Sequence, residues 1–131
     1  MQKIAHAPGL ADAIGPFSQA VIANGFVFVT GQMASGPAGL EDQPEGFEDR
    51  VRRTLENLRS VLTEAGTDLD HVVRCNGYLT SKDQLEPYNK IYAEFFGSHR
   101  PARTSICVEL WGLDLEIDCI AVLPDNKAAA S

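Results

Sequence analysis

The sequence predicts an α+β domain in which two helices pack on one sheet, in the order β-β-α-β-α-β-β. Three patterns predict this class. Asn24 and Gly25 separate two short apolar runs, as in a β-hairpin. Apolar residues recur at spacings of three and four over residues 45–65 and 83–96, as on the buried face of a helix. Apolar runs of strand length follow both helices.

Strands are predicted at 17–22, 25–30, 71–80, 102–110 and 114–123. A loop rich in Gly and Pro separates the hairpin from the first helix. That helix ends at Gly66, which suits the position after a helix because it adopts a left-handed backbone easily. Pro87 falls in the first turn of the second helix, where a missing N–H costs little.

The composition fits one domain with a single core. The chain has 131 residues, of which 44% are hydrophobic and 22% charged. We expect the domain to span residues 1–131, with its core at about 13–123 and a flexible tail at 124–131. The start lacks a basic region followed by a long apolar run, and no stretch is long enough to span a bilayer. The expected location is the cytoplasm, with reduced cysteines and no membrane contact.

Charge and motif spacing narrow the classes of partner. The formal net charge is −7, with only 11 Lys and Arg, whereas a protein that grips nucleic acid usually shows a basic surface. No residues have the spacing of metal ligands, and no Gly-rich phosphate loop is present. We therefore expect neither a metal nor a nucleic acid as the main partner.

Both faces of the predicted sheet carry apolar residues. Phe26 and Phe28 point to one face while Val27 and Val29 point to the other, because side chains alternate along a strand. The strand at 114–123 is likewise apolar on much of both faces. Two helices cover only one face, so we expect a homo-oligomer in which another subunit covers the other.

Arg103 stands at the start of a predicted strand. An inward-facing Arg needs an anionic partner because it keeps its charge. From the residues alone, an Arg at the start of a strand is more often solvated or paired with a protein residue, here Glu116. The planar guanidinium group of Arg103 also matches a ligand carboxylate. Ser105 and Cys107 follow on the same strand face. No triad marks Ser105 as a nucleophile, and Cys107 is interpreted as a small core residue.

Glu116 is an acidic residue among apolar ones in the run LEIDC (115–119). A carboxylate in a partly dry cleft has its pKa raised toward neutrality, which suits general acid–base catalysis. Asp118 lies on the same strand face and is an alternative acid. The residues alone leave open whether either carboxylate only neutralises the positive charge of Arg103.

Five motifs occur in one order along the chain: IGPFSQAV (14–21), VTGQM (29–33), YNKIYAEFF (88–96), RPARTSI (100–106) and LEIDCIAV (115–122). With them the chain resembles the reactive-intermediate deaminase family, RidA/YjgF, whose older name is endoribonuclease L-PSP. The resemblance implies a chorismate-mutase-like fold with a mixed sheet and a homotrimer with clefts between subunits. It also implies hydrolysis of 2-imino acids to 2-keto acids and ammonia, without a cofactor or metal.

The resemblance also implies roles for particular residues. Arg103 would bind the carboxylate of the substrate, and Glu116 would be the acidic residue of the site. The other implied site residues are Gly31, Thr30, Asn89, Ser105 and Phe17. Asn89 fits a solvated helix position equally well. Phe17 stands where the family commonly has Tyr, and the segment WGLD (111–114) looks shorter than in typical members and carries a Trp.

The predicted function is hydrolysis of imines of the 2-iminobutanoate and 2-iminopropanoate type. Arg103 anchors the substrate, Glu116 activates the water that attacks the C=N carbon, and the backbone at Gly31 holds the imine nitrogen or the water. Two alternatives stay open. One is a regulatory trimer that binds small carboxylates without catalysis, which Phe17 keeps open. The other is an endoribonuclease, against which the acidic charge weighs.

Overall fold

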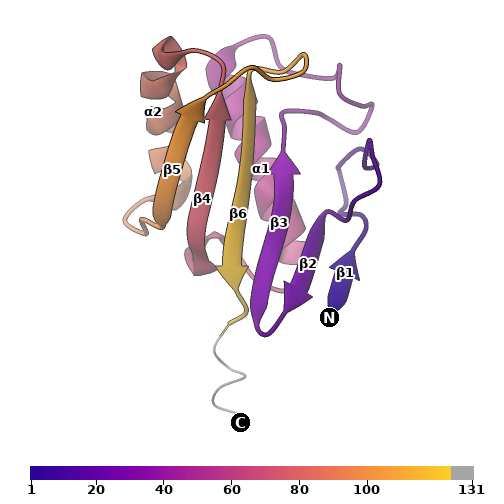
Figure 1. The fold of residues 1–131 in the computed structure, drawn as a ribbon. Coiled ribbons are helices and arrows are strands. Elements are labelled where there is room, and N and C mark those ends of the chain that lie inside the picture. Colours follow the sequence, from indigo (N-terminus) through magenta and orange to yellow (C-terminus); the bar gives the residue numbers. More distant parts are fainter. Residues whose placement is uncertain (125–131) are drawn as a thin grey trace.

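Within residues 1–124, six strands form one mixed sheet that is backed by two helices (Figure 1). The computed structural model describes residues 1–124, so the tail predicted at 124–131 lies, except for Pro124, outside the described residues. The strands are β1 (Gln2–Ile4), β2 (Ala20–Ala23), β3 (Phe26–Gln32), β4 (Val72–Leu79), β5 (Ala102–Cys107) and β6 (Leu115–Val122). The helices are α1 (Phe47–Glu64) and α2 (Leu85–Phe96), with short 3-10 helices η1 (Leu69–His71) and η2 (Lys82–Gln84).

The spatial order of the strands is β1-β2-β3-β6-β4-β5. β4 and β5 run parallel, and the other neighbouring pairs run antiparallel. The predicted α+β class, with two helices on one mixed sheet, is confirmed. The last strand of the chain lies in the middle of the sheet, which places β6 beside both β3 and β4.

The predicted hairpin is present, although its first strand begins later than expected. Ala23 pairs with Phe26 across a turn made by Asn24 and Gly25, whose φ angles are 53° and 78°. A two-residue turn of this kind needs positive φ at both positions, which Asn and Gly tolerate. The strand predicted from residue 17 begins at Ala20, because the segment before it makes a tight turn in which the Phe17 N–H donates to the Gly15 carbonyl.

β5 is shorter than predicted. It was expected to reach residue 110, but it ends at Cys107, which pairs with Leu79, the last residue of β4. Among the described strands, β5 lies at the edge of the sheet and pairs with β4 alone, so it ends where β4 ends. Cys107 is therefore exposed rather than a core residue, which corrects the prediction for it. At the opposite edge, β1 was not predicted and extends the sheet through β2.

The two faces of the sheet differ sharply in burial. One face, called the helix face, packs against α1 and α2 and carries Val27, Val29, Cys75, Leu115, Ile117 and Cys119, all buried. The opposite face, called the open face, looks toward the viewer in Figure 1. Its residues Phe26 and Phe28 are 42% and 44% exposed. The predicted apolar surface on the second face is thus present in one copy of the chain.

Candidate functional site

Glu116 lies on the open face, next to the end of β3. Its neighbours along β6 pack into the core, so strand alternation turns its side chain outward. The pairing of β3 with β6 shifts between Val29 and Gln32, and this irregularity brings Gly31 against the carboxylate. A Cβ at residue 31 would lie 2.8 Å from the Cδ of Glu116, so any other residue there would displace the Glu116 carboxylate from its place. Glycine therefore permits the approach.

Glu116 is the acid that the geometry favours over Asp118. Burial and, secondly, the negative charge of Asp118 raise the pKa of Glu116 above its ordinary value. Asp118 has a partner on each oxygen: Asn76 Nδ2 donates to Oδ1 at 2.8 Å and the Tyr78 hydroxyl donates to Oδ2 at 3.0 Å. Glu116 has no hydrogen bond or salt bridge of this kind within the described part of the chain. Its carboxylate is available for proton transfer.

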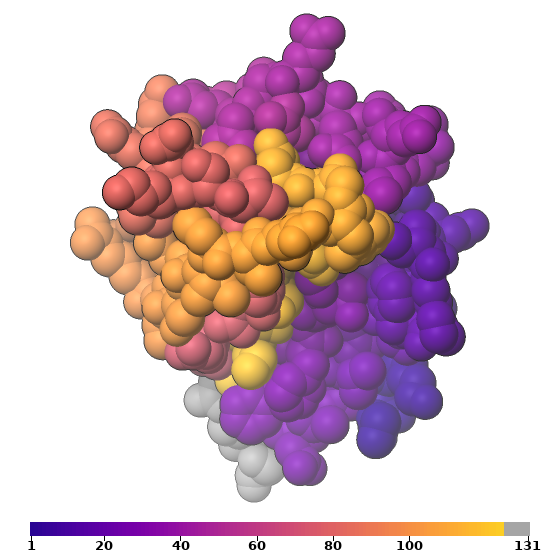
Figure 2. Space-filling model, turned by 45° about the horizontal axis from the view of Figure 1, so that its top comes forward, coloured from indigo at the N-terminus to yellow at the C-terminus, as the bar shows by residue number. Residues whose placement is uncertain are grey.

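A hollow of about 340 Å³ opens in front of Glu116. Its lining comes from the turn before β2, the end of β3 and the connection from β5 to β6. The lining residues, called here the glutamate half-site, are Ile14, Phe17, Thr30, Gly31, Met33, Trp111 and Glu116. In Figure 2 the connection, in orange and yellow, stands forward while the purple surface beside it is set back. The volume falls in the range of sites that bind small molecules.

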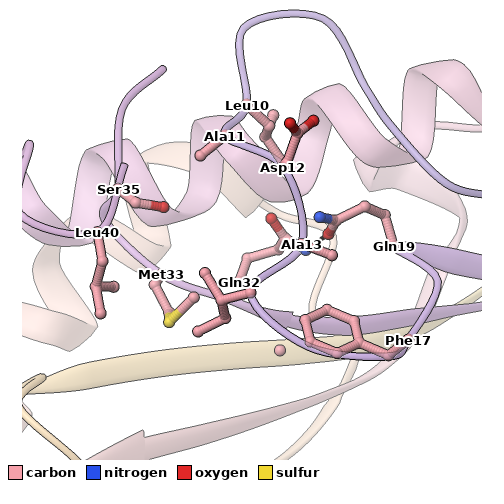
Figure 3. A pocket seen from close by; sticks show the side chains of 12 residues that line it. Leu10, Ala11, Asp12, Ala13, Phe17, Gln19, Gln32, Met33, Ser35 and Leu40 are labelled. Carbon is pink, nitrogen blue, oxygen red and sulfur yellow. Dashed lines mark hydrogen bonds between the residues drawn. The ribbon is translucent and has the colours of Figure 1, made fainter. Parts of the chain in front are cut away.

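Phe17 lines this hollow rather than the core. Its side chain is 43% exposed. Beside it lie the buried side chains of Gln19 and Gln32 (Figure 3). Gln32 Nε2 donates to Gln19 Oε1 at 2.9 Å and to the Thr30 carbonyl at 3.2 Å. This buried bond ties the segment that carries Phe17 to the end of β3, so it fixes one wall of the hollow against another.

Arg103 occupies a different place, on the helix face of β5. Its Cζ lies 5.0 Å from the ring centroid of Tyr88 and 4.8 Å from that of Tyr92, so two aromatic faces support the guanidinium. The Ser105 hydroxyl donates to the Tyr88 hydroxyl at 3.4 Å. These four residues are called the arginine half-site. In the chain as described, Arg103 forms no salt bridge.

The two half-sites lie on opposite faces of the sheet in one copy of the chain. Cys75 of β4 pairs with Arg103 on one side and with Cys119 on the other, so all three point to the helix face. Glu116 is three residues from Cys119 along β6 and points to the open face. Glu116 is therefore not the partner of Arg103 within one chain, which excludes a pairing that the sequence left open.

The remaining predicted residue, Asn89, is exposed on α2. Within the described residues no hydrogen bond joins it to either half-site, although it follows Tyr88 in sequence. Sequence reasoning placed Tyr88 and Tyr92 on the apolar stripe of the helix and missed that they support Arg103. Their spacing of four residues was visible, but it did not indicate which strand they would meet.

The described residues contain neither a metal-binding cluster nor a membrane-spanning helix. No group of three or more His, Cys, Asp or Glu there is arranged to hold a metal ion. Among the helices that the structure describes, none combines the length and apolar character needed to cross a membrane.

Comparisons with known proteins agree with this fold. Residues 5–123 match the family described as Endoribonuclease L-PSP. The chain is 34% identical over 113 residues to Reactive Intermediate Deaminase A, chloroplastic, of Arabidopsis thaliana, an alignment that covers 85% of this chain and 60% of the relative. A crystal structure from Thermotoga maritima is 35% identical, with a TM-score of 0.88 over 95% of this chain and 99% of that chain. The structure of Escherichia coli TdcF with bound serine is 28% identical, with a TM-score of 0.86 over 94% of this chain and 100% of that chain.

The fold and the two half-sites define a small mixed α+β domain with a ligand-sized hollow on its open face. The chain belongs to the Endoribonuclease L-PSP family, which includes a protein named as a reactive intermediate deaminase. The resemblance seen in the five sequence motifs and the fold that it implied are both confirmed.

Proposed function

We propose that this protein hydrolyses 2-imino acids to 2-keto acids and ammonia, with Arg103 and Glu116 supplied by different copies of the chain. The observation that carries the proposal is the placement of the two half-sites on opposite faces of one copy. Among the described residues, each of the two charged groups lacks an ionic partner. Together they complement a substrate with a carboxylate at one end and a reacting C=N group beside it.

The proposed assembly is a homotrimer in which the open faces of the subunits meet. Exposed Phe26 and Phe28 support this assembly, because an apolar surface on a sheet face is normally covered. In the trimer, the arginine half-site at the β5 edge of one subunit faces the glutamate half-site of the next. The assembly therefore completes the site.

The proposed chemistry follows from the two groups. Arg103, supported by the rings of Tyr88 and Tyr92, binds the substrate carboxylate through its planar fork. Glu116 takes a proton from a water molecule, whose oxygen forms a bond to the imine carbon. Glu116 passes this proton to the nitrogen as the C=N double bond becomes a single bond. The proton of the new hydroxyl group is then transferred to the nitrogen as well, so the C–N bond breaks, the C=O bond forms, and ammonia leaves the 2-keto acid. Backbone groups at Thr30 and Gly31 orient the water or the imine nitrogen, as the resemblance suggests.

The test measures release of 2-keto acid from an imine that an amino-acid oxidase generates in situ. We expect Arg103→Ala to lower kcat/KM by about 100-fold, because the anchor sets the reacting geometry. Arg103→Lys keeps the positive charge but lacks the two parallel N–H donors of the guanidinium group, so its activity should lie between those of the wild-type protein and Arg103→Ala. Arg59→Ala, which removes an exposed Arg on α1, serves as the matched control. Full activity of Arg103→Ala would contradict the proposal.

A second candidate is a subunit assembly that binds small carboxylates without turnover. Phe17 favours it, because this residue offers no hydroxyl to orient a substrate or water. The relative TdcF was crystallised with serine bound, which fits either candidate. Calorimetry that detects binding of a 2-keto acid, together with no imine hydrolysis, would select the second candidate. The cytoplasmic location expected from the sequence stays a prediction.

A further inference from the structure

The connection between β5 and β6 presents an exposed tryptophan beside the hollow. Trp111 is the single tryptophan of the chain. Its side chain is 55% exposed, the largest such fraction among the residues that line the hollow. An indole that the fold leaves uncovered offers a large apolar surface to whatever enters next to it.

The backbone on both sides of Trp111 is anchored. Before it, the Val108 N–H donates to the Leu79 carbonyl at 2.7 Å. After it, Gly112 turns the chain with a φ of 89°, a value that favours glycine, and Leu113 is buried. The backbone that carries the indole is therefore fixed by the fold of the connection.

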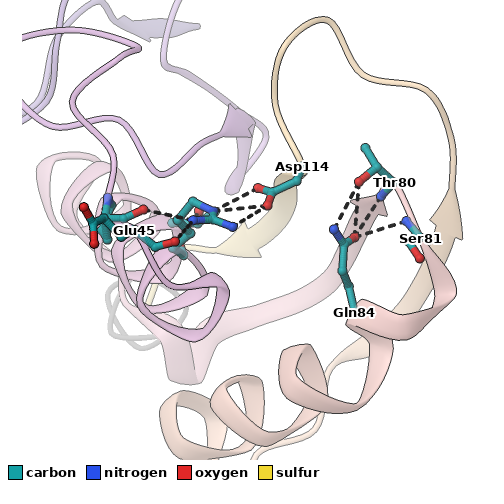
Figure 4. Close-up of polar contacts among 8 residues, drawn as sticks. Glu45, Thr80, Ser81, Gln84 and Asp114 are labelled. Atoms are coloured by element: carbon teal, nitrogen blue, oxygen red, sulfur yellow. Dashed lines mark hydrogen bonds and ion pairs between the residues drawn. The ribbon is translucent and has the colours of Figure 1, made fainter.

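A salt bridge holds the connection where β6 begins. Arg50 of α1 donates to Asp114 from Nη2 at 2.7 Å and from Nε at 3.1 and 3.2 Å (Figure 4). The same guanidinium donates from Nη1 to the carbonyls of Pro44 and Glu45. One side chain thus joins the segment before α1 to the segment that presents Trp111.

The walls of the hollow are mainly apolar. Ile14, Phe17, Met33 and Trp111 form them, and Glu116 is the one ionisable residue in the lining. The first three come from segments that the Gln19–Gln32 hydrogen bond and β3 hold in place, while Trp111 comes from the opposite side. A ligand that reaches Glu116 therefore has apolar surface on several sides of its remaining atoms.

We propose that this hollow holds the side chain of the imino acid and that Trp111 selects branched or aromatic apolar side chains over a methyl group. The inference rests on the proposed function and adds the substrate class to it. A methyl group leaves the apolar walls in contact with water, whereas a larger apolar group displaces that water. One methylene more or less in such a pocket changes selectivity about tenfold or more.

The first test uses Trp111 as its own reporter. The wild-type protein is titrated with 4-methyl-2-oxopentanoate, the keto acid with the side chain of leucine, and with pyruvate, while calorimetry measures occupancy. We expect the emission maximum to move to shorter wavelength with the larger acid and to stay unchanged with pyruvate at equal occupancy. If the emission maximum does not change while the larger acid is bound, the inference is overturned. This result would be expected if another subunit already covers the indole.

The second test compares imines derived from leucine and from alanine. Trp111→Ala should lower kcat/KM for the leucine-derived imine about tenfold and change that for the alanine-derived imine less than about threefold. Trp111→Phe should keep most of the preference. Leu85→Ala removes an exposed apolar residue of α2 that does not line the hollow, so it is the matched control. An equal fall for both imines overturns the inference.

The outcomes separate this inference from the proposed function. If no imine is hydrolysed, the proposed function fails, and the fluorescence titration still decides whether larger apolar acids meet Trp111. If imines are hydrolysed and the wild-type protein prefers the alanine-derived one, the function stands and the side-chain pocket fails. Thermal unfolding of each variant shows whether a loss reflects folding.

Discussion

At the scale of single residues, the surroundings of Glu116 make it suitable as a general base, more than the fact that it is an acid. Its side chain leaves the core, contacts the backbone of Gly31 and lies two residues along β6 from a second carboxylate on the same face. Burial and Asp118 both raise its pKa. A carboxyl group with a raised pKa accepts a proton from water more readily than an ordinary one. Asp118, held by Asn76 and Tyr78, acts on the site through its charge.

The pH dependence of activity tests this setting. A general base must be ionised, so kcat/KM should rise as the pH increases through the pKa of Glu116. Asp118→Asn removes the neighbouring negative charge and should lower that pKa, which moves the acid limb of the profile to lower pH. Part of the elevation should persist because burial remains.

The control is Asp70→Asn, which removes one exposed acid in η1 at the opposite end of β4. Its profile should match that of the wild-type protein. An acid limb that stays in place, or moves to higher pH, in Asp118→Asn would count against Glu116 as the base.

At the scale of elements, α1 fixes the loop that follows β3. Asn57 of α1 is buried, and its Nδ2 donates to the carbonyls of Met33 at 2.9 Å and Ser35 at 2.8 Å. Asn57→Ala leaves both carbonyls without this donor, so the free energy of unfolding should fall by about 1–3 kcal/mol. Urea denaturation measures the change. Glu56→Ala, on the exposed side of the same helix, should change it by less than about 0.5 kcal/mol. Equal unfolding of the two variants would contradict this role.

The elements themselves were largely predictable because each has a local pattern. The apolar period over α1 and the Asn24-Gly25 turn depend only on neighbouring residues, and both are found as expected. β1 was missed because three residues carry no recognisable period, and its place depends on pairing with β2. The end of β5 was misjudged because it depends on where its partner β4 ends.

The candidate site was predictable in its residues but not in its geometry. Arg103 and Glu116 could be named from motifs along the chain. Their placement on opposite faces depends on the order of β5, β4 and β6 in the sheet, which no local pattern contains. The aromatic support of Arg103 by Tyr88 likewise depends on how α2 packs against β5.

At the scale of the whole molecule, one copy of the chain is incomplete in two ways. The open face leaves Phe26 and Phe28 exposed, and the charged groups of the proposed site lie on different faces of the sheet. A single assembly would cover the exposed apolar face and also complete the site, because contact between the open faces would bring the half-sites of neighbouring subunits together. We therefore propose that Arg103 of one subunit acts together with Glu116 of another.

Mixing two inactive variants tests this claim most directly. Arg103→Ala and Glu116→Gln are each expected to lose most imine hydrolysis, and the two are unfolded together in equal amounts and refolded. If the site lies between subunits, half of the sites receive an intact Arg103, half of those receive an intact Glu116, and about one quarter of wild-type activity returns. If both residues act within one chain, every site lacks one of them and the mixture stays inactive. Recovery near one quarter is the predicted result, and no recovery from a mixture that has formed mixed oligomers would contradict the account.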